Sequence, residues 1–277
     1  MTGSIDGAVP EPALPGPPGA GPIPAGQLPA ASIPPGPPAP APEPAPARPR
    51  HRWGLGAFVV AELVFLLASF GSAALFLTGP SVDAGQLALT LAVPTVLAAL
   101  VAVLFTVVRG HGPVADLRLR GGWRDVGLGV AFGFGGLFLT LPAAAVYVAI
   151  VGQDASSAVG DVFAGITADP LTALAIVAIV VIVAPLCEEV LYRGLLWGGL
   201  EKLGAGRWVA FAVTTVVFAL AHFEWPRAVL LLVVALPLGL ARVYSGGLVA
   251  PVLAHQINNL LPGIGLYLVL TGALPGA

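Results

Sequence analysis

Charged residues are scarce in this chain. Asp, Glu, Lys and Arg make up 9% of its 277 residues, whereas hydrophobic residues make up 57% and the mean hydropathy is +0.93. Soluble globular domains contain about 25% charged residues, so the composition excludes an ordinary soluble enzyme with a hydrated surface. The net charge of −2 excludes a strongly basic nucleic-acid-binding protein, and we expect no nucleic-acid partner. The single cysteine excludes a disulfide framework and a multi-cysteine metal cluster.

Proline is abundant only at the start of the chain. Seventeen of the 28 prolines lie in the first 50 residues, which contain few large apolar side chains. Such a segment cannot offset its chain entropy by burial, and it favours extended polyproline II conformers. We therefore predict a disordered Pro/Ala/Gly-rich cytoplasmic tail over residues 1–52, with no secretory signal peptide. Residues 53–277 are predicted to form a transmembrane helical domain.

The remainder of the chain consists of apolar runs separated by short polar breaks. A transmembrane helix needs roughly 20 apolar residues, so residues 53–277 can hold seven or eight spans. The fold class is therefore predicted to be all-α, a polytopic transmembrane helix bundle. The predicted spans cover about 57–78, 86–108, 126–151, 171–200, 208–223, 227–244 and 248–261, and the last residues, to Ala273, could form a short eighth helix after Pro262.

The distribution of Lys and Arg predicts the orientation in the membrane. Basic residues precede the first span, follow the second and sixth, and lie between the fourth and fifth. The alternate loops contain aspartates instead, and Arg227 is the one basic exception. Because cytoplasmic loops are enriched in Lys and Arg, we expect a multi-pass protein of the cell membrane with a cytoplasmic N-terminus.

Several polar residues lie inside the predicted later spans. The first three spans share one acid, Glu62, but the later ones contain three groups of residues, each with a pair four positions apart and with at least one polar member. Residues four apart lie on the same face of a helix. Because ionisable residues within a membrane usually face the bundle interior or a water-filled cavity, these groups indicate a functional site. The groups are Glu188 and Glu189 with Arg193, Phe218 with His222, and His255 with Asn259.

The residue types in these groups are those of a hydrolase. Glu188 can take a proton from a water molecule that His222 helps to hold. His255 and Asn259 can donate hydrogen bonds to a carbonyl oxygen as it gains negative charge. Glu189 is predicted to pair with Arg193.

Other interpretations of the same residues remain open. Glu188, His222 and His255 could instead bind zinc with one open coordination position. The Glu189–Arg193 pair could be purely structural, and the other polar residues could serve as hydrogen bonds between helices. Arg242 and Tyr244 are interpreted as anchors at the membrane interface.

The three groups occur in the order E-E-x-x-x-R, F-x-x-x-H and H-x-x-x-N, which resembles the signature motifs of the CPBP family of intramembrane proteases. This family includes type II CAAX prenyl endopeptidases and bacteriocin-processing proteins. The resemblance covers about residues 171–265 and implies a glutamate-dependent intramembrane endopeptidase. It implies that the substrate is a membrane-embedded or lipid-anchored protein or peptide, and it leaves a metal requirement open. The residues it implicates are Glu188, Glu189, Arg193, His222, His255 and Asn259.

A second function remains compatible with the sequence. The chain could be a non-catalytic membrane protein, an immunity factor or a scaffold, that retains the polar cluster for packing.

Overall fold

The computed structural model describes residues 51–77, 79, 82–152 and 158–274, so nearly all of the predicted tail lies outside the described residues. Within the described part of the chain the structure is helical and contains no strand, as predicted. The longer helices are α1 (Leu55–Phe76), α2 (Ala84–Arg109), α4 (Trp123–Val151), α6 (Pro170–Ala178), α9 (Arg207–Ala221), α10 (Ala228–Ser245) and α11 (Val249–Leu270). The shorter helices are α3 (Pro113–Asp116), α5 (Ala158–Val162), α7 (Ala184–Glu189) and α8 (Trp197–Lys202).

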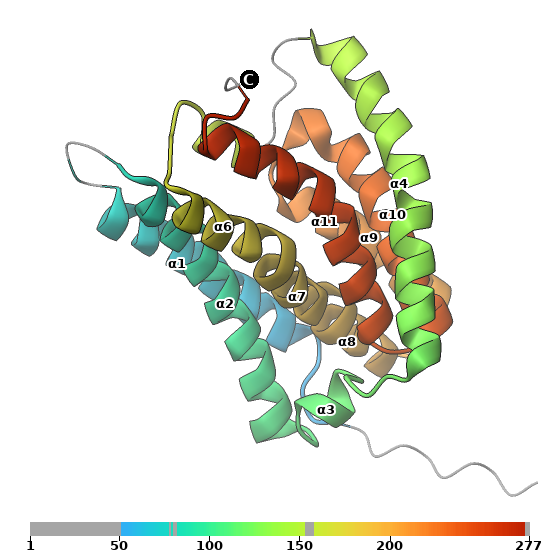
Figure 1. Ribbon diagram of the computed structural model, residues 1–277. Coiled ribbons are helices and arrows are strands. Elements are labelled where there is room, and N and C mark those ends of the chain that lie inside the picture. Colours follow the sequence, from blue (N-terminus) through green and yellow to red (C-terminus); the bar gives the residue numbers. More distant parts are fainter. Residues whose placement is uncertain (1–50, 78, 80–81, 153–157, 275–277) are drawn as a thin grey trace, which may run out of the picture. The chain divides into compact units, whose positions relative to one another are not determined.

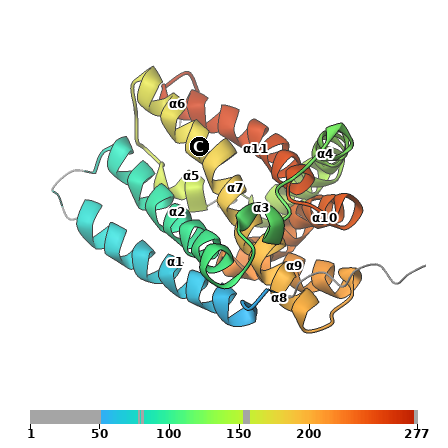
Figure 2. The same cartoon turned by 90° about the horizontal axis from the view of Figure 1, so that it is seen from below.

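A long rod made of α6, α7 and α8 runs through the middle of the helical bundle. Helices α1 and α2 pack against one another on one side of this rod, whereas α4, α10 and α11 lie on the other side (Figure 1, Figure 2). Helix α9 packs beside α10 and contacts the rod near α8. Because the rod contacts both groups of helices, residues on its different faces can meet side chains from α1 and from α11.

Two π-helical segments interrupt the rod without ending it. They cover Ile179–Val183 and Val190–Leu196, on either side of α7. A π-helical turn contains one extra residue and changes the direction of the side chains that follow, and such turns are frequent at functional sites. The predicted fourth span is thus confirmed as one continuous helix from Pro170 to Lys202, and the predicted site glutamates lie at the end of α7, between its two irregular segments.

Five helices are long and apolar enough to cross a membrane, by length and composition. They are Leu55–Phe76, Ala84–Arg109, Trp123–Val151, Pro170–Lys202 and Trp225–Ser245. Two further predicted spans differ from these. Helix α9 has only 15 residues, and α11 has 22 residues but includes several polar side chains at its centre. The described part of the protein is therefore a multi-pass membrane protein in which two helices that carry site residues are shorter or more polar than ordinary spans.

Of the two alternatives, seven or eight helices, the separate eighth helix after Pro262 does not form. Helix α11 continues without a break through Pro262 to Leu270. A proline inside a helix removes one hydrogen bond and crowds the preceding turn, but packing against neighbouring helices compensates for this loss within a membrane. Gly263 permits such packing, since a Cβ atom at that position would lie 2.5 Å from the side chain of Val181 in the first π-helical segment.

Aspartates begin two of the helices that surround the site. Asp83 and Gln86 form a reciprocal capping box at the start of α2. Asp169 accepts hydrogen bonds from the backbone N–H groups of Leu171 and Thr172 at the start of α6. The Thr172 hydroxyl also donates to the Asp169 carboxylate, and this bond lowers the pKa of that carboxyl. Such N-terminal caps satisfy backbone donors that the helix itself cannot.

The loops at the opposite end of the bundle are basic, and hydrogen bonds and an ion pair connect them to α8. The indole of Trp53 is buried and donates to Asp116, and the backbone carbonyl of Trp53 accepts a hydrogen bond from Lys202. Arg118 forms an ion pair with Glu201 at 2.6 Å. These contacts join the start of α1 and the α2–α4 connection to α8, so that the central rod is fixed at this end.

Candidate active site

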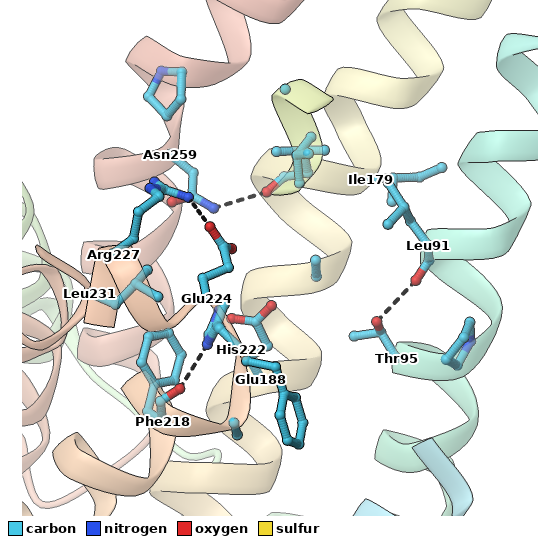
Figure 3. A pocket seen from close by; sticks show the side chains of 18 of the residues that line it. Leu91, Thr95, Ile179, Glu188, Phe218, His222, Glu224, Arg227, Leu231 and Asn259 are labelled. Atoms are coloured by element: carbon cyan, nitrogen blue, oxygen red, sulfur yellow. Dashed lines mark hydrogen bonds and ion pairs between the residues drawn. The ribbon is translucent and has the colours of Figure 1, made fainter. Parts of the chain in front are cut away.

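A cavity of about 1110 Å³ lies between the central rod and the surrounding helices. It is lined by residues of α1, α2, α5, α7, α9, α10 and α11, of the two π-helical segments, and of the turn between α9 and α10. Four of the predicted site residues line it: Glu188, His222, His255 and Asn259. Figure 3 shows His222 and Glu188 pointing into the same part of this cavity. The structure thus brings the three polar groups of the sequence together around one space.

The two neighbouring glutamates face the same histidine from different sides. Nδ1 of His255 lies 3.0 Å from Oε1 of Glu189, and its Nε2 lies 3.8 Å from Oε2 of Glu188. The Glu189 side chain is completely buried, whereas the Glu188 side chain keeps 24% of its surface exposed. Only Glu188 is therefore open to water and to a ligand in the cavity, and Glu189 fixes the imidazole ring.

Arg193 holds Glu189 in place, as the four-residue spacing predicts. Its guanidinium donates to Oε1 of Glu189 at 2.9 Å, and neither side chain is exposed. The guanidinium also donates to the carbonyl of Ala235 and lies 4.6 Å from the centre of the Phe218 ring. A buried charge needs such partners, because leaving it unpaired is costly. Glu189 and Arg193 thus form a rigid support behind His255 and do not line the cavity.

His222 lies at the end of α9, where the helix stops short. Its Nδ1 is 2.7 Å from the carbonyl of Phe218, one turn earlier. A carbonyl accepts the hydrogen bond, so Nδ1 carries the hydrogen and Nε2 is left as the acceptor when the ring is neutral. Phe218 is buried and its ring lies against both histidines, 4.7 Å from His222 and 5.7 Å from His255 between ring centroids. Phe218 therefore orients the two imidazoles.

Two consecutive asparagines on α11 have different roles. The amide of Asn259 donates to the carbonyl of Val180 at 3.0 Å, within the first π-helical segment, and the residue lines the cavity. Asn258 is buried and accepts a hydrogen bond from the hydroxyl of Thr140 on α4 at 3.3 Å. An amide nitrogen has two hydrogens, so Asn259 can bind Val180 and still donate to a ligand, while Asn258 connects α11 to α4.

The donor set gives no support to the zinc alternative. Among the described residues, no group of three His, Cys, Asp or Glu side chains is placed to hold a metal ion.

The sequence interpretation of Arg242 is wrong. We predicted an anchor at the membrane interface, but the side chain is buried, and its Nε donates to the carbonyl of Arg193 at 3.0 Å. Its guanidinium lies 5.3 Å from the ring of Trp197. Arg242 lies among the buried residues of α10. Its neighbours in the sequence are apolar, so they gave no indication that it has a polar partner. Tyr244 is 52% exposed, as an interface residue would be.

Two further residues that line the cavity, Tyr192 and Glu62, were not predicted as site residues. Tyr192 follows Glu188 by one turn, and its buried ring packs edge-on against Phe218 at 5.3 Å. Glu62 of α1 lines the same cavity from the opposite wall. An acid in an otherwise apolar span was the one available signal for Glu62.

Comparisons with known proteins agree with this geometry. Residues 170–261 match the family model described as type II CAAX prenyl endopeptidase Rce1-like. No curated protein and no solved structure matches the chain. The matched segment contains the central rod, the short helix α9 and the polar part of α11, and so it includes every residue of the three motifs. Residues 170–261 form a domain of the Rce1-like type II CAAX prenyl endopeptidase family.

Proposed function

We propose that this protein is an intramembrane endopeptidase that hydrolyses peptide bonds with a water molecule activated by Glu188. The observation that carries the proposal is the meeting of Glu188, His222, His255 and Asn259 around one cavity inside a helical bundle. The substrate is a membrane-embedded or lipid-anchored protein or peptide. The family match of residues 170–261 supports a protease of this kind.

The chemistry begins at Glu188, the one motif carboxylate that is open to the cavity. Its carboxylate takes a proton from water as the water oxygen attacks the carbonyl carbon of the scissile bond. Nε2 of His222 accepts a hydrogen bond from the same water molecule and so fixes its position. The tetrahedral intermediate then collapses, Glu188 returns the proton to the leaving nitrogen, and the C–N bond breaks.

The developing oxyanion is stabilised by donors from α11. Asn259 supplies its free amide hydrogen. His255 lies one turn away on the same helix, and because its Nδ1 donates to Glu189, its cavity-facing Nε2 can donate only when both ring nitrogens carry a hydrogen. Glu189 and Arg193 act as positioning residues, since they hold the other edge of the His255 ring. Fixed donors of this kind lower the barrier because they need no reorganisation during the reaction.

Replacement of Glu188 by glutamine tests the proposal directly. Glutamine keeps the size of the side chain but cannot take the proton, so cleavage of a membrane-tethered peptide should fall by about 10²–10⁴-fold. The thermal unfolding temperature should stay close to that of the wild type. The matched control is Glu201→Gln, on the same rod but outside the cavity, where the carboxylate pairs with Arg118. Undiminished cleavage by Glu188→Gln would show that another group activates the water.

The orientation predicted from the basic loops also bears on the substrate. The lining of the cavity includes α5 residues such as Asp161, and it includes Glu224 and Arg227 in the turn between α9 and α10. These lie at the end of the bundle opposite the basic contacts of Arg118 and Lys202. With the basic end in the cytoplasm, the cavity is reached from the outer side of the membrane, and the substrate segment must be presented there.

A further inference from the structure

The wall of the cavity opposite Glu188 contains a second carboxyl group, that of Glu62. Glu62 is the one ionisable residue of α1, in a helix whose other residues are apolar or small. It lies outside the segment that matches the family model. Because a charged residue within a span is costly and usually functional, its presence in the cavity needs an explanation that the proposed chemistry does not supply.

The surroundings of Glu62 satisfy its carboxyl group only in part, through a hydrogen bond with the side chain of Tyr192. Its Oε1 atom is buried and has no hydrogen-bond partner. The polar side chains that face it are Tyr192, His222 and Glu188, two of them from the central rod and one from the end of α9. A buried polar atom without a partner costs free energy, so this atom is suited to receive a donor that enters the cavity with a ligand.

The nearby cations are already engaged by other acids. Arg193 is buried against Glu189, and Arg227 at the far end of the cavity forms an ion pair with Glu224. Glu62 and Glu188 therefore face the same space without an arginine or lysine of their own among the described residues that line it. A cationic group beside Glu62 would gain a charge-assisted hydrogen bond in surroundings that contain little water, and Glu188 would stay free to bind the catalytic water.

We propose that Glu62 is a specificity-determining residue that binds a basic side chain, lysine or arginine, of the substrate next to the scissile bond. This inference rests on the proposed endopeptidase activity and names one feature of its substrates. A site built to pair with a polar group rejects an analogue that lacks the group, because the buried partner is then left unpaired. Peptides with a neutral side chain at that position should therefore be cleaved more slowly.

The test compares matched peptides on the purified full-length protein in lipid vesicles. Each peptide is anchored to the bilayer by an acyl chain and carries either lysine or norleucine, in turn, at the positions flanking the scissile bond. At one of these positions wild-type protein should cleave the lysine peptide with a kcat/KM about tenfold higher or more. Glu62→Gln should reduce this preference to about one while changing cleavage of the norleucine peptide little.

The control is Ser69→Ala, on the same helix and in the same cavity. The Ser69 hydroxyl donates its hydrogen bond to the carbonyl of Phe65, so removal of the hydroxyl should leave the lysine preference intact. Equal losses for both peptides in Glu62→Gln would overturn the proposal, as would a wild-type protein without any lysine preference. Failure of the endopeptidase proposal looks different, because the wild-type protein would then cleave neither the lysine peptides nor the norleucine peptides.

Discussion

A cluster of charged side chains without access to solvent lies behind the candidate active site. Glu189 and Arg193 are both fully buried and are joined by a hydrogen bond of 2.9 Å. Oε2 of Glu189 and Nε of Arg193 have no hydrogen-bond partner. The pair is therefore only partly compensated for its loss of hydration. What it does secure is the position of His255, whose Nδ1 lies 3.0 Å from the same carboxylate oxygen.

Breaking this pair should be more harmful than removing both members. Arg193→Met leaves Glu189 buried without its cation, and we expect a loss of about 3–5 kcal/mol in unfolding free energy. The double variant Glu189→Gln/Arg193→Met removes both charges and should regain much of that loss. Thermal or denaturant unfolding in detergent of the wild type, Arg193→Met, Glu189→Gln and the double variant measures the coupling between the two positions.

Additive effects of the two substitutions would contradict this account. They would mean that Glu189 and Arg193 are stabilised by separate surroundings. A double variant that unfolds like the wild type but does not cleave peptides would instead separate the two consequences of the pair, which are folding and the orientation of His255.

At the scale of helices, close approach depends on glycines of α4 that face its neighbours. A Cβ atom at Gly133 would lie 2.8 Å from the Cβ of Ile257, and one at Gly129 would lie 2.9 Å from the carbonyl of Ala250. Small residues at helix contacts let backbones approach closely within membranes. This approach holds α11 against α4 at the level of the buried bond between Thr140 and Asn258.

Substitution by alanine should lower the stability at one glycine of α4, Gly133, but not at another, Gly135. Gly133→Ala forces Ile257 and α11 to move, so we expect a loss of about 1–3 kcal/mol in unfolding free energy. Gly135 has no atom within 4 Å of the place where its Cβ would lie. Gly135→Ala should therefore be neutral, or stabilising by up to about 1 kcal/mol, because alanine favours a helix over glycine. Unfolding of both variants in the same detergent compares the two faces of α4, and equal gains in stability would show that helix propensity, and not packing, decides the outcome.

Hydrophobic periodicity and spacing predicted a large part of these elements. The one-turn spacing from Glu189 to Arg193 predicted their pairing because both lie in one helix, where the distance is fixed locally. The continuation of α11 through Pro262 was not predicted, since it depends on the contact of Gly263 with Val181 of another helix. The partner of Arg242 was missed for the same reason: its acceptor belongs to a residue 49 positions earlier.

At the scale of the whole molecule, the two ends of the bundle differ in charge and in shape. One end contains the basic loops, tied together by the ion pair of Arg118 with Glu201 and by the hydrogen bond from Lys202 to Trp53. The other end carries α5 and the turn that follows the short helix α9, and residues of both line the cavity. The side from which a substrate enters therefore depends on which end faces the cytoplasm.

Cysteine labelling in intact cells can decide the orientation. The native chain has a single cysteine, Cys187, which is buried and provides an unlabelled background. Ala164 is exposed and lines the cavity, whereas Ala115 is exposed in α3 at the basic end. A maleimide that does not cross membranes should label Ala164→Cys in intact cells and Ala115→Cys only after permeabilisation. This pattern is expected because Lys and Arg are retained on the cytoplasmic side during insertion. The reverse pattern, or equal labelling of both sites, would mean that the loop charges do not set this topology. The cavity would then not be restricted to substrates on the outer side.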